Sequence, residues 1–156
     1  MDRKYKVGGY VKLAKLWERA KDAAVAYHSS YYAEKFKTDS DKKLVGVYID
    51  ITGNKEIYKR PEMVHLLKDC KKGAVNLIFS QTRAYLAANT CDFCFLLKYL
   101  FDLPFPFHVQ VVLSMQDILS HGLMCIFRLI LSDFAVGYQH QEWCRLEHEM
   151  EKADGK

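Results

Sequence analysis

The chain has 156 residues, 50% of them hydrophobic and 27% charged, which is the composition of one globular domain with a substantial core. Its net charge of +4 is a mild basic excess, compatible with a nucleic-acid partner without establishing one. Five cysteines, no apolar N-terminal leader and no uncharged apolar run long enough to cross a bilayer predict a cytoplasmic protein with free thiols, and argue against a secreted or membrane protein.

Strand and helix patterns alternate over the first half of the chain. Residues 5–13 predict a strand, and the alanine-rich residues 14–36 predict a helix. Apolar side chains recur in this helix at helical spacing, at Leu16, Ala20, Ala24, Tyr27 and Tyr31. After a polar connection, the branched apolar run 44–49 is typical of a buried parallel strand.

The same alternation continues with a helix that has clear ends. We expect the helix to begin at Pro61, to end at Lys71 and to be terminated by Gly73. Its buried stripe is expected to consist of Met63, Leu66, Leu67 and Cys70. Further elements are predicted as a strand at 75–79, a helix at 89–101, a strand at 107–112 and one long helix from about residue 115 to 152.

This order predicts an α/β fold, a mostly parallel β-sheet with helices on both faces and a long C-terminal helix. We expect one domain with two parts. Residues 1–114 form the α/β part, and residues 115–156 form a long C-terminal oligomerisation helix and tail.

Four stretches carry a family resemblance. They are LVGVYID at 44–50 with Thr52 and Gly53 after it, KRP at 59–61, KGAVNLI at 72–78, and Ala87, Asn89, Thr90 and Asp92. In this order they resemble the catalytic domain of serine recombinases, the resolvase/invertase family, and the resemblance extends over nearly the whole chain. It implies the resolvase fold, DNA recombination and a C-terminal dimerisation helix.

The resemblance also implies a chemistry for which this chain lacks the groups. In that family a serine attacks a DNA phosphodiester while arginines neutralise the phosphate. Where the family reads Y-x-R-x-S, residues 10–14 place Lys12 at the arginine and Ala14 at the serine. Where it reads S-R-x-x-R-N, Tyr85 and Ala88 replace the two arginines. A methyl group cannot form a phosphodiester, so we expect a pseudoenzyme.

Some groups for phosphate binding remain. Arg60 matches a third arginine of the family, and Arg83 lies two positions early for another. With Lys12 and Lys59, they are the candidate phosphate or DNA contacts. Ser80 and Thr82 are the candidate replacement nucleophiles, but neither has an evident activating base close in sequence. The short charged tail 147–156 stands where family members carry a DNA-binding module.

Residues 123–143 are apolar on more than one helical stripe, so a helix here must be covered on several faces. We expect a homo-oligomer, a homodimer in its simplest form, with the interface at Leu123, Phe127, Ile130, Phe134 and Tyr138. The alternative is that this segment packs within its own chain.

Three weaker signals have simpler explanations. The pair Cys91 and Cys94 has the spacing of a redox or zinc motif, but no second such pair accompanies it, and we favour two small residues packed in a helix. His140, Cys144 and His148 recur every four residues, so the outer pair lies about 12 Å apart along a helix and cannot share one metal. An adjacent pair could bind one across a dimer, but we favour a polar helix face. A basic region made up of Lys35, Lys37, Lys42, Lys43, Lys55, Lys59 and Arg60 is either a phosphate-binding or a solvated surface, and we favour the latter. No metal or cofactor is expected.

The leading hypothesis is a catalytically inactive serine-recombinase-like protein of a mobile genetic element. It would act by protein binding, with DNA binding as an additional option, for example by modulating an intact serine recombinase. The first alternative is a small inhibitor or adaptor of an unrelated host or defence protein. The second is residual recombinase or DNA-binding activity, and a nucleotide-binding loop at Thr52–Lys55 is the weakest idea.

Overall fold

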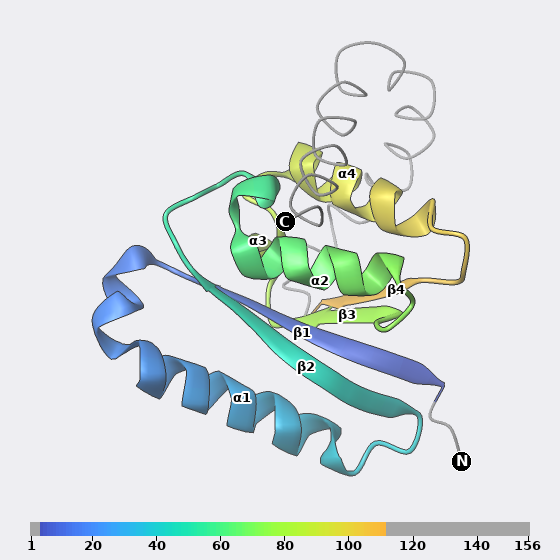
Figure 1. Ribbon diagram of the computed structural model, residues 1–156, viewed down its shortest axis with the longest axis horizontal. Helices are drawn as coiled ribbons and strands as arrows, with labels where there is room; N and C mark the ends of the chain where they lie inside the picture. Colours follow the sequence, from blue (N-terminus) through green and yellow to red (C-terminus); the bar gives the residue numbers. More distant parts are fainter. Residues whose placement is uncertain (1–3, 112–156) are drawn as a thin grey trace. The chain divides into compact units, whose positions relative to one another are not determined.

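The computed structural model describes residues 4–111, in which helices flank a parallel sheet (Figure 1). The elements are β1 (Tyr5–Leu13), η1 (Lys15–Ala20), α1 (Lys21–Lys37), β2 (Lys42–Ile51), η2 (Ile57–Lys59), α2 (Pro61–Lys71), β3 (Leu77–Ser80), α3 (Arg83–Leu86), α4 (Thr90–Phe101) and β4 (His108–Val111). The predicted helix 115–152, and with it the expected oligomer interface, lies outside the described residues. Within residues 4–111, no helix combines the length and apolar character that a membrane crossing requires.

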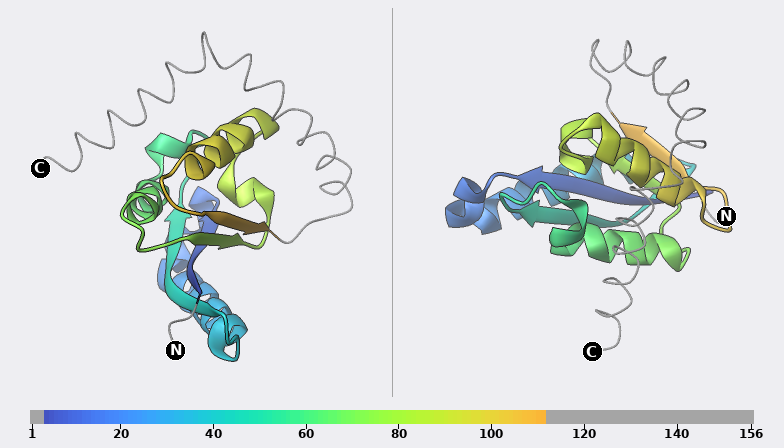
Figure 2. Two further views of the ribbon diagram at one scale, coloured as in Figure 1. Left: turned by 90° about the vertical axis from the view of Figure 1, so that its right-hand side faces the viewer. Right: turned by 90° about the horizontal axis from the view of Figure 1, so that it is seen from above.

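The four strands lie in the order β2-β1-β3-β4, and every neighbouring pair is parallel. Tyr10 of β1 is in register with Tyr48 of β2 on one side and with Ser80 of β3 on the other. The sheet is strongly twisted, so that β1 and β2 run across the direction of β3 and β4 (Figure 2). The predicted parallel sheet is confirmed. The strand expected to be buried, β2, lies at an edge, and there Lys43 and Val45 are exposed.

Two adjacent glycines in β1 show that helices cover both faces of the sheet. A Cβ atom at Gly8 would lie 2.7 Å from Cδ1 of Leu66 in α2. A Cβ atom at Gly9 would lie 2.5 Å from the ring of Tyr32 in α1. Because neighbouring residues of a strand face opposite ways, α1 and α2 lie on opposite sides of β1 (Figure 1). The predicted helices on both faces are confirmed.

The core on the α1 side is aromatic. Tyr32 and Phe36 of α1 each contact Phe79 of β3 edge to face, with ring centroids 5.7 and 5.3 Å apart. Val7 and Val11 of β1, with Leu77 of β3, complete this buried cluster.

The start of the predicted helix 14–36 differs from expectation. Residues 15–20 form 3₁₀ turns, and α1 begins only at Lys21. Leu16 and Tyr27, which share the apolar helical spacing, are 75% and 66% exposed. Ala24, Tyr32 and Phe36 are the residues of α1 that are buried against the sheet. The apolar spacing therefore marks a mixed face: Leu16, Ala20 and Tyr27 are exposed, whereas Ala24 is buried and Tyr31 packs against the core.

The helix α2 has the boundaries that the sequence predicts. It runs from Pro61 to Lys71 and buries Met63, Leu66, Leu67 and Cys70, the four residues of the expected stripe. Gly73 follows it with φ +73°, a conformation that suits glycine at the end of a helix. Burial raises the pKa of the Cys70 thiol well above its ordinary value.

Candidate functional site

The candidate site lies at the carboxyl ends of β1, β2 and β3. Lys12 is in register with Asp50, and Tyr10 with Ser80. The segment after β1 begins at Ala14, and the loop after β2 begins at Thr52, whose N–H donates to the Leu13 carbonyl at 3.0 Å. Parallel pairing thus brings the expected nucleophile position, the replacement hydroxyls and the basic loop to one edge of the sheet.

Asp50 is the buried carboxylate of this edge, with 4% of its surface exposed. It accepts a hydrogen bond from the Tyr10 hydroxyl at 2.9 Å. It also accepts from the backbone N–H groups of Glu62 and Met63 at the start of α2, at 3.0 and 2.9 Å. Burial, and then the Asp50 charge, raise the pKa of Tyr10 far above its ordinary value, so the phenol stays protonated. These two side chains hold β1, β2 and α2 together and offer no free base or nucleophile.

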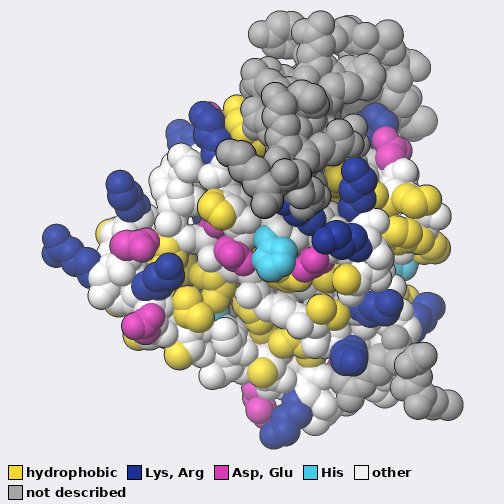
Figure 3. All heavy atoms as spheres, in the orientation of Figure 1, with side chains coloured by type: hydrophobic (Ala, Val, Ile, Leu, Met, Phe, Trp, Pro, Cys, Tyr) yellow, Lys and Arg dark blue, Asp and Glu magenta, His cyan; other side chains and the backbone are white. Residues whose placement is uncertain are grey.

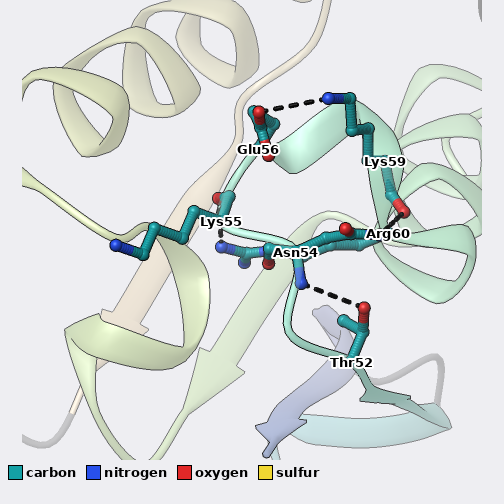
Figure 4. A network of polar contacts seen from close by, with 6 residues as sticks. All are labelled: Thr52, Asn54, Lys55, Glu56, Lys59 and Arg60. Atoms are coloured by element: carbon teal, nitrogen blue, oxygen red, sulfur yellow. Dashed lines mark hydrogen bonds and ion pairs between the residues drawn. The ribbon is translucent and has the colours of Figure 1, made fainter. Parts of the chain in front are cut away.

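Arg60 has no exposed surface. Its guanidinium donates to four backbone carbonyls, those of Asn54 at 3.3 Å, Lys55 at 2.6 Å, Tyr85 at 2.9 Å and Leu86 at 3.0 Å. Figure 4 shows the side chain turned inward beneath the loop of residues 54–56. The expectation that Arg60 contacts a phosphate does not fit this arrangement, because every guanidinium nitrogen already donates to the backbone. Through these hydrogen bonds, Arg60 connects the loop after β2 with α3.

The hydroxyl groups of this edge are also engaged. Ala14, at the expected nucleophile position, is exposed and directly follows β1. Ser80 is fully buried, with its hydroxyl 2.9 Å from the Tyr10 carbonyl and 3.3 Å from that of Thr82. The Thr82 hydroxyl caps α3 by accepting from the Ala84 N–H at 3.3 Å. Neither replacement hydroxyl lies free beside Ala14.

The two positions that match the missing arginines serve packing or face solvent. The ring of Tyr85 packs against the buried cluster on the α1 side of the sheet. Ala88 is exposed between α3 and α4. Arg83 is half-buried at the start of α3, and its charge partly offsets the burial that raises the pKa of Cys94 in α4. Arg83 therefore lies near Cys94 of α4.

Lysines are the cations that remain at the open part of the edge. Lys12 is half-buried, and its burial is the main cause of its lowered pKa. The positive charges of Arg60 and Lys55 also lower this pKa, whereas the negative charge of Asp50 raises it. Lys55 is exposed and points away from Arg60 (Figure 4). Lys59 is exposed but forms an ion pair with Glu56 at 3.2 Å. This set of groups can attract an anion.

The described part of the chain gives little support for a metal site or for a redox-active cysteine pair. No three His, Cys, Asp or Glu side chains within residues 4–111 are grouped to hold a metal ion. Cys94 is buried, and burial with the neighbouring Cys91 raises its pKa, which disfavours the thiolate. The pair thus fits the simpler explanation of packing in a helix.

Two roles were missed by sequence reasoning. The Tyr10–Asp50 contact joins two strands forty residues apart in the chain. Asn89 caps α4 by accepting from the Asp92 N–H at 2.8 Å, and its side-chain amide donates to the Asp92 carboxylate at 3.0 Å. The second role has a local signal, because an asparagine followed three residues later by an acidic residue is typical of a helix start.

Comparison with known proteins places the chain by its fold. No family model and no curated protein sequence matches it. The N-terminal catalytic domain of TP901-1 integrase matches with a TM-score of 0.57 and 15% identity, covering 83% of this chain and 98% of that one. The C-terminal catalytic domain of ISC1926 TnpA, an IS607-like serine recombinase, matches with a TM-score of 0.55 and 14% identity, covering 97% and 99%. The chain therefore has the fold of a serine-recombinase catalytic domain, and the predicted resemblance is confirmed at that level.

Proposed function

We propose that this chain, which has the fold of a serine-recombinase catalytic domain, is a recombinase-related protein that has lost strand cleavage and acts by binding other macromolecules. The observation that carries the proposal is the end of β1, where an exposed alanine, Ala14, stands at the position to which the family resemblance assigns the nucleophile. The nearby hydroxyls of Ser80 and Thr82 form hydrogen bonds within the fold. No side chain of this set can attack a phosphodiester without rearrangement of the backbone around it.

The charges at this edge support the same conclusion. Phosphoryl transfer needs donors that are fixed around the phosphate oxygens, and the planar guanidinium of arginine suits this task because it can hold two oxygens at once. Here Arg60 is committed to backbone carbonyls, and the two other arginine positions hold Tyr85 and Ala88. Lys12 and Lys55 supply point charges on flexible stems. They can attract a phosphate without orienting it for displacement.

The proposed mode of action is association with a protein of the same fold. An intact serine recombinase is the partner that fits best, because proteins of the same fold can share an interface. A mixed assembly that contains this chain would lack one nucleophile and could not complete cleavage. We place the self-association at the apolar C-terminal residues Leu123, Phe127, Ile130, Phe134 and Tyr138, on the basis of the sequence pattern. Modulation of an active recombinase in a mobile genetic element would follow from such mixed assembly.

A covalent-adduct assay tests the loss of cleavage. Purified chain is incubated with a plasmid that carries the DNA flanking its own gene, and protein–DNA adducts are sought on denaturing gels. We expect none, and we expect none from Ala14→Ser, because a restored hydroxyl still lacks the guanidinium groups. Adducts formed by the native chain and lost in Ser80→Ala or Thr82→Ala would overturn the proposal.

A second experiment tests the partner. The tagged chain is cross-linked in its native host and the captured proteins are identified by mass spectrometry, with Phe127→Asp and Phe134→Asp as interface controls. Recovery of a serine recombinase that has its nucleophile, lost in the controls, supports the proposal. Recovery of an unrelated host or defence enzyme in its place favours an adaptor role and contradicts modulation of a recombinase.

A further inference from the structure

A second surface lies next to the candidate site, on η1 and the first turns of α1. None of the six residues of η1 is buried. Leu16 is 75% exposed, Trp17 46% and Tyr27 66%, and these are three of the five large hydrophobic side chains exposed in the described part of the chain. Where exposed apolar side chains form a contiguous patch, that patch commonly marks an interaction site.

The backbone explains why this surface stays open. The chain leaves β1 at Leu13, and the Trp17 N–H donates to the Ala14 carbonyl at 3.0 Å as the 3₁₀ turns begin. These turns and the start of α1 lie beyond the end of the sheet (Figure 1). Most of the burial of α1 comes later, at Tyr32 and Phe36. The Trp17 and Tyr27 side chains are therefore not among those that α1 and the turns before it bury against the sheet.

Basic side chains alternate with the apolar ones on this surface. Lys15, Arg19 and Lys21 are all exposed, and none forms an ion pair with another described residue. Lys12 and Lys55 extend the same positive region across the ends of β1 and β2, where the Lys55 charge is close enough to contribute to the lowered pKa of Lys12. The carboxylates among residues 15–23 are those of Glu18 and Asp22. Figure 3 shows Lys and Arg side chains at this end of the molecule, at the left of the view, with Asp or Glu side chains between them.

We propose that this surface, made of Lys15, Leu16, Trp17, Arg19, Lys21 and Tyr27, binds single-stranded nucleic acid. Its cations would follow the phosphates, and the indole of Trp17 would stack on a base. Tyr27, in the second turn of α1 beyond the 3₁₀ turns, would offer a second exposed ring to the same strand.

Two features favour a single strand over other anionic partners. The bases of a duplex are stacked on one another and leave the exposed indole uncovered, whereas splayed bases bury it. An apolar protein surface would cover the rings but would place Lys15, Arg19 and Lys21 against a partner that must supply matching carboxylates. A nucleic-acid strand provides flat apolar groups and regularly spaced negative charge together. This inference stands independently of whether catalysis is lost.

Fluorescence offers a direct test, because the chain has only two tryptophans, Trp17 and Trp143. In full-length Trp143→Phe, titration with a 15-nucleotide oligo-dT at low salt should quench Trp17. Binding of a labelled oligo-dT, followed by anisotropy, should weaken about fivefold or more in Trp17→Ala, the loss expected for one stacked base. The matched control is Phe101→Ala, which removes an exposed aromatic ring elsewhere and should leave binding unchanged.

The salt dependence tests the charges. Replacing Lys15 and Arg19 by Gln should lower the slope of log K against log salt by about 1.4, because each phosphate contact on a single strand contributes about 0.7. Lys37→Gln with Lys98→Gln, two exposed cations that already form ion pairs, should not change the slope. Equal binding of duplex and single strand with no effect of Trp17→Ala would overturn the proposal. So would loss of self-association in Trp17→Ala with oligo-dT binding unchanged.

Discussion

Tyr10 and Asp50 form a buried hydrogen bond, 2.9 Å between the phenol oxygen and one carboxylate oxygen, that connects the central strand to its neighbour. The same carboxylate accepts the first N–H groups of α2. A negative charge at the start of a helix is favourable because it lies at the positive end of the helix dipole. One side chain therefore fixes the position of β1, β2 and α2 relative to one another.

Replacing Asp50 should destabilise the fold strongly. Asp50→Ala leaves the buried Tyr10 hydroxyl and two N–H groups without an acceptor, and we expect the free energy of unfolding to fall by about 3 kcal/mol. Tyr10→Phe removes one hydroxyl and leaves the helix contacts in place, so a loss of about 1 kcal/mol is expected. Urea unfolding followed by circular dichroism measures both. Equal midpoints for the two variants would show that the helix contacts of Asp50 contribute nothing.

Arg60 should act as a stabilising residue of the loop after β2. Arg60→Lys keeps the charge but cannot reach carbonyls of both the loop and α3, so we expect a loss of about 2–4 kcal/mol in unfolding free energy. Limited proteolysis should then cut the variant within residues 52–59 faster than the native chain. Lys59→Gln is the control, because that neighbouring lysine is exposed and should cost less than about 0.5 kcal/mol. Unchanged stability in Arg60→Lys would restore Arg60 as a candidate phosphate contact.

Local signals predicted those parts of the fold that local physics determines. The helix α2 has a proline at its first residue, a regular apolar stripe and a glycine in the left-handed conformation after its end, and its bounds were predicted correctly. The 3₁₀ turns of η1 were not foreseen, because alanine and leucine favour helix in general. Whether Leu16 lies on the sheet depends on where β1 ends relative to α1. That is a property of the assembled fold and not of the spacing.

The site shows the same division. The sequence predicted a mostly parallel sheet, and parallel pairing places Lys12, Ala14 and the start of the loop after β2 at one edge of it. The role of Arg60 was not predictable, since its acceptors are backbone carbonyls of two segments that meet only in the folded chain. A comparison of sequences shows which side chain stands at a position that matches the family. It does not show which backbone atoms surround that side chain in the fold.

The cap of α4 gives a local prediction. Asn89→Ala removes the acceptor for the Asp92 N–H and should lower the unfolding free energy by about 1 kcal/mol. Asn89→Ser keeps a capping oxygen and should lie within a few tenths of a kcal/mol of the native chain, while the exposed neighbour Ala88→Ser should be neutral. Thermal unfolding of the three variants compares them directly. If Asn89→Ser is as unstable as Asn89→Ala, the capping contact is not the source of the stability.

Gly9 should tolerate no side chain, although it lies in an ordinary strand. A Cβ atom there would lie 2.5 and 2.6 Å from two ring carbons of Tyr32, which is fully buried and packed against Phe79. Since the ring has no free direction in which to move, we expect Gly9→Ala to cost about 1–3 kcal/mol through overpacking. Gly46 of β2 provides the matched control, because the nearest atom to a Cβ atom there is 3.8 Å away. Gly46→Ala should be neutral or slightly stabilising. If the ring is the obstacle, Gly9→Ala should cost less in a Tyr32→Leu background than in the native chain. A Gly9→Ala chain as stable as Gly46→Ala in urea would mean that α1 does not approach β1 as closely as the structure places it.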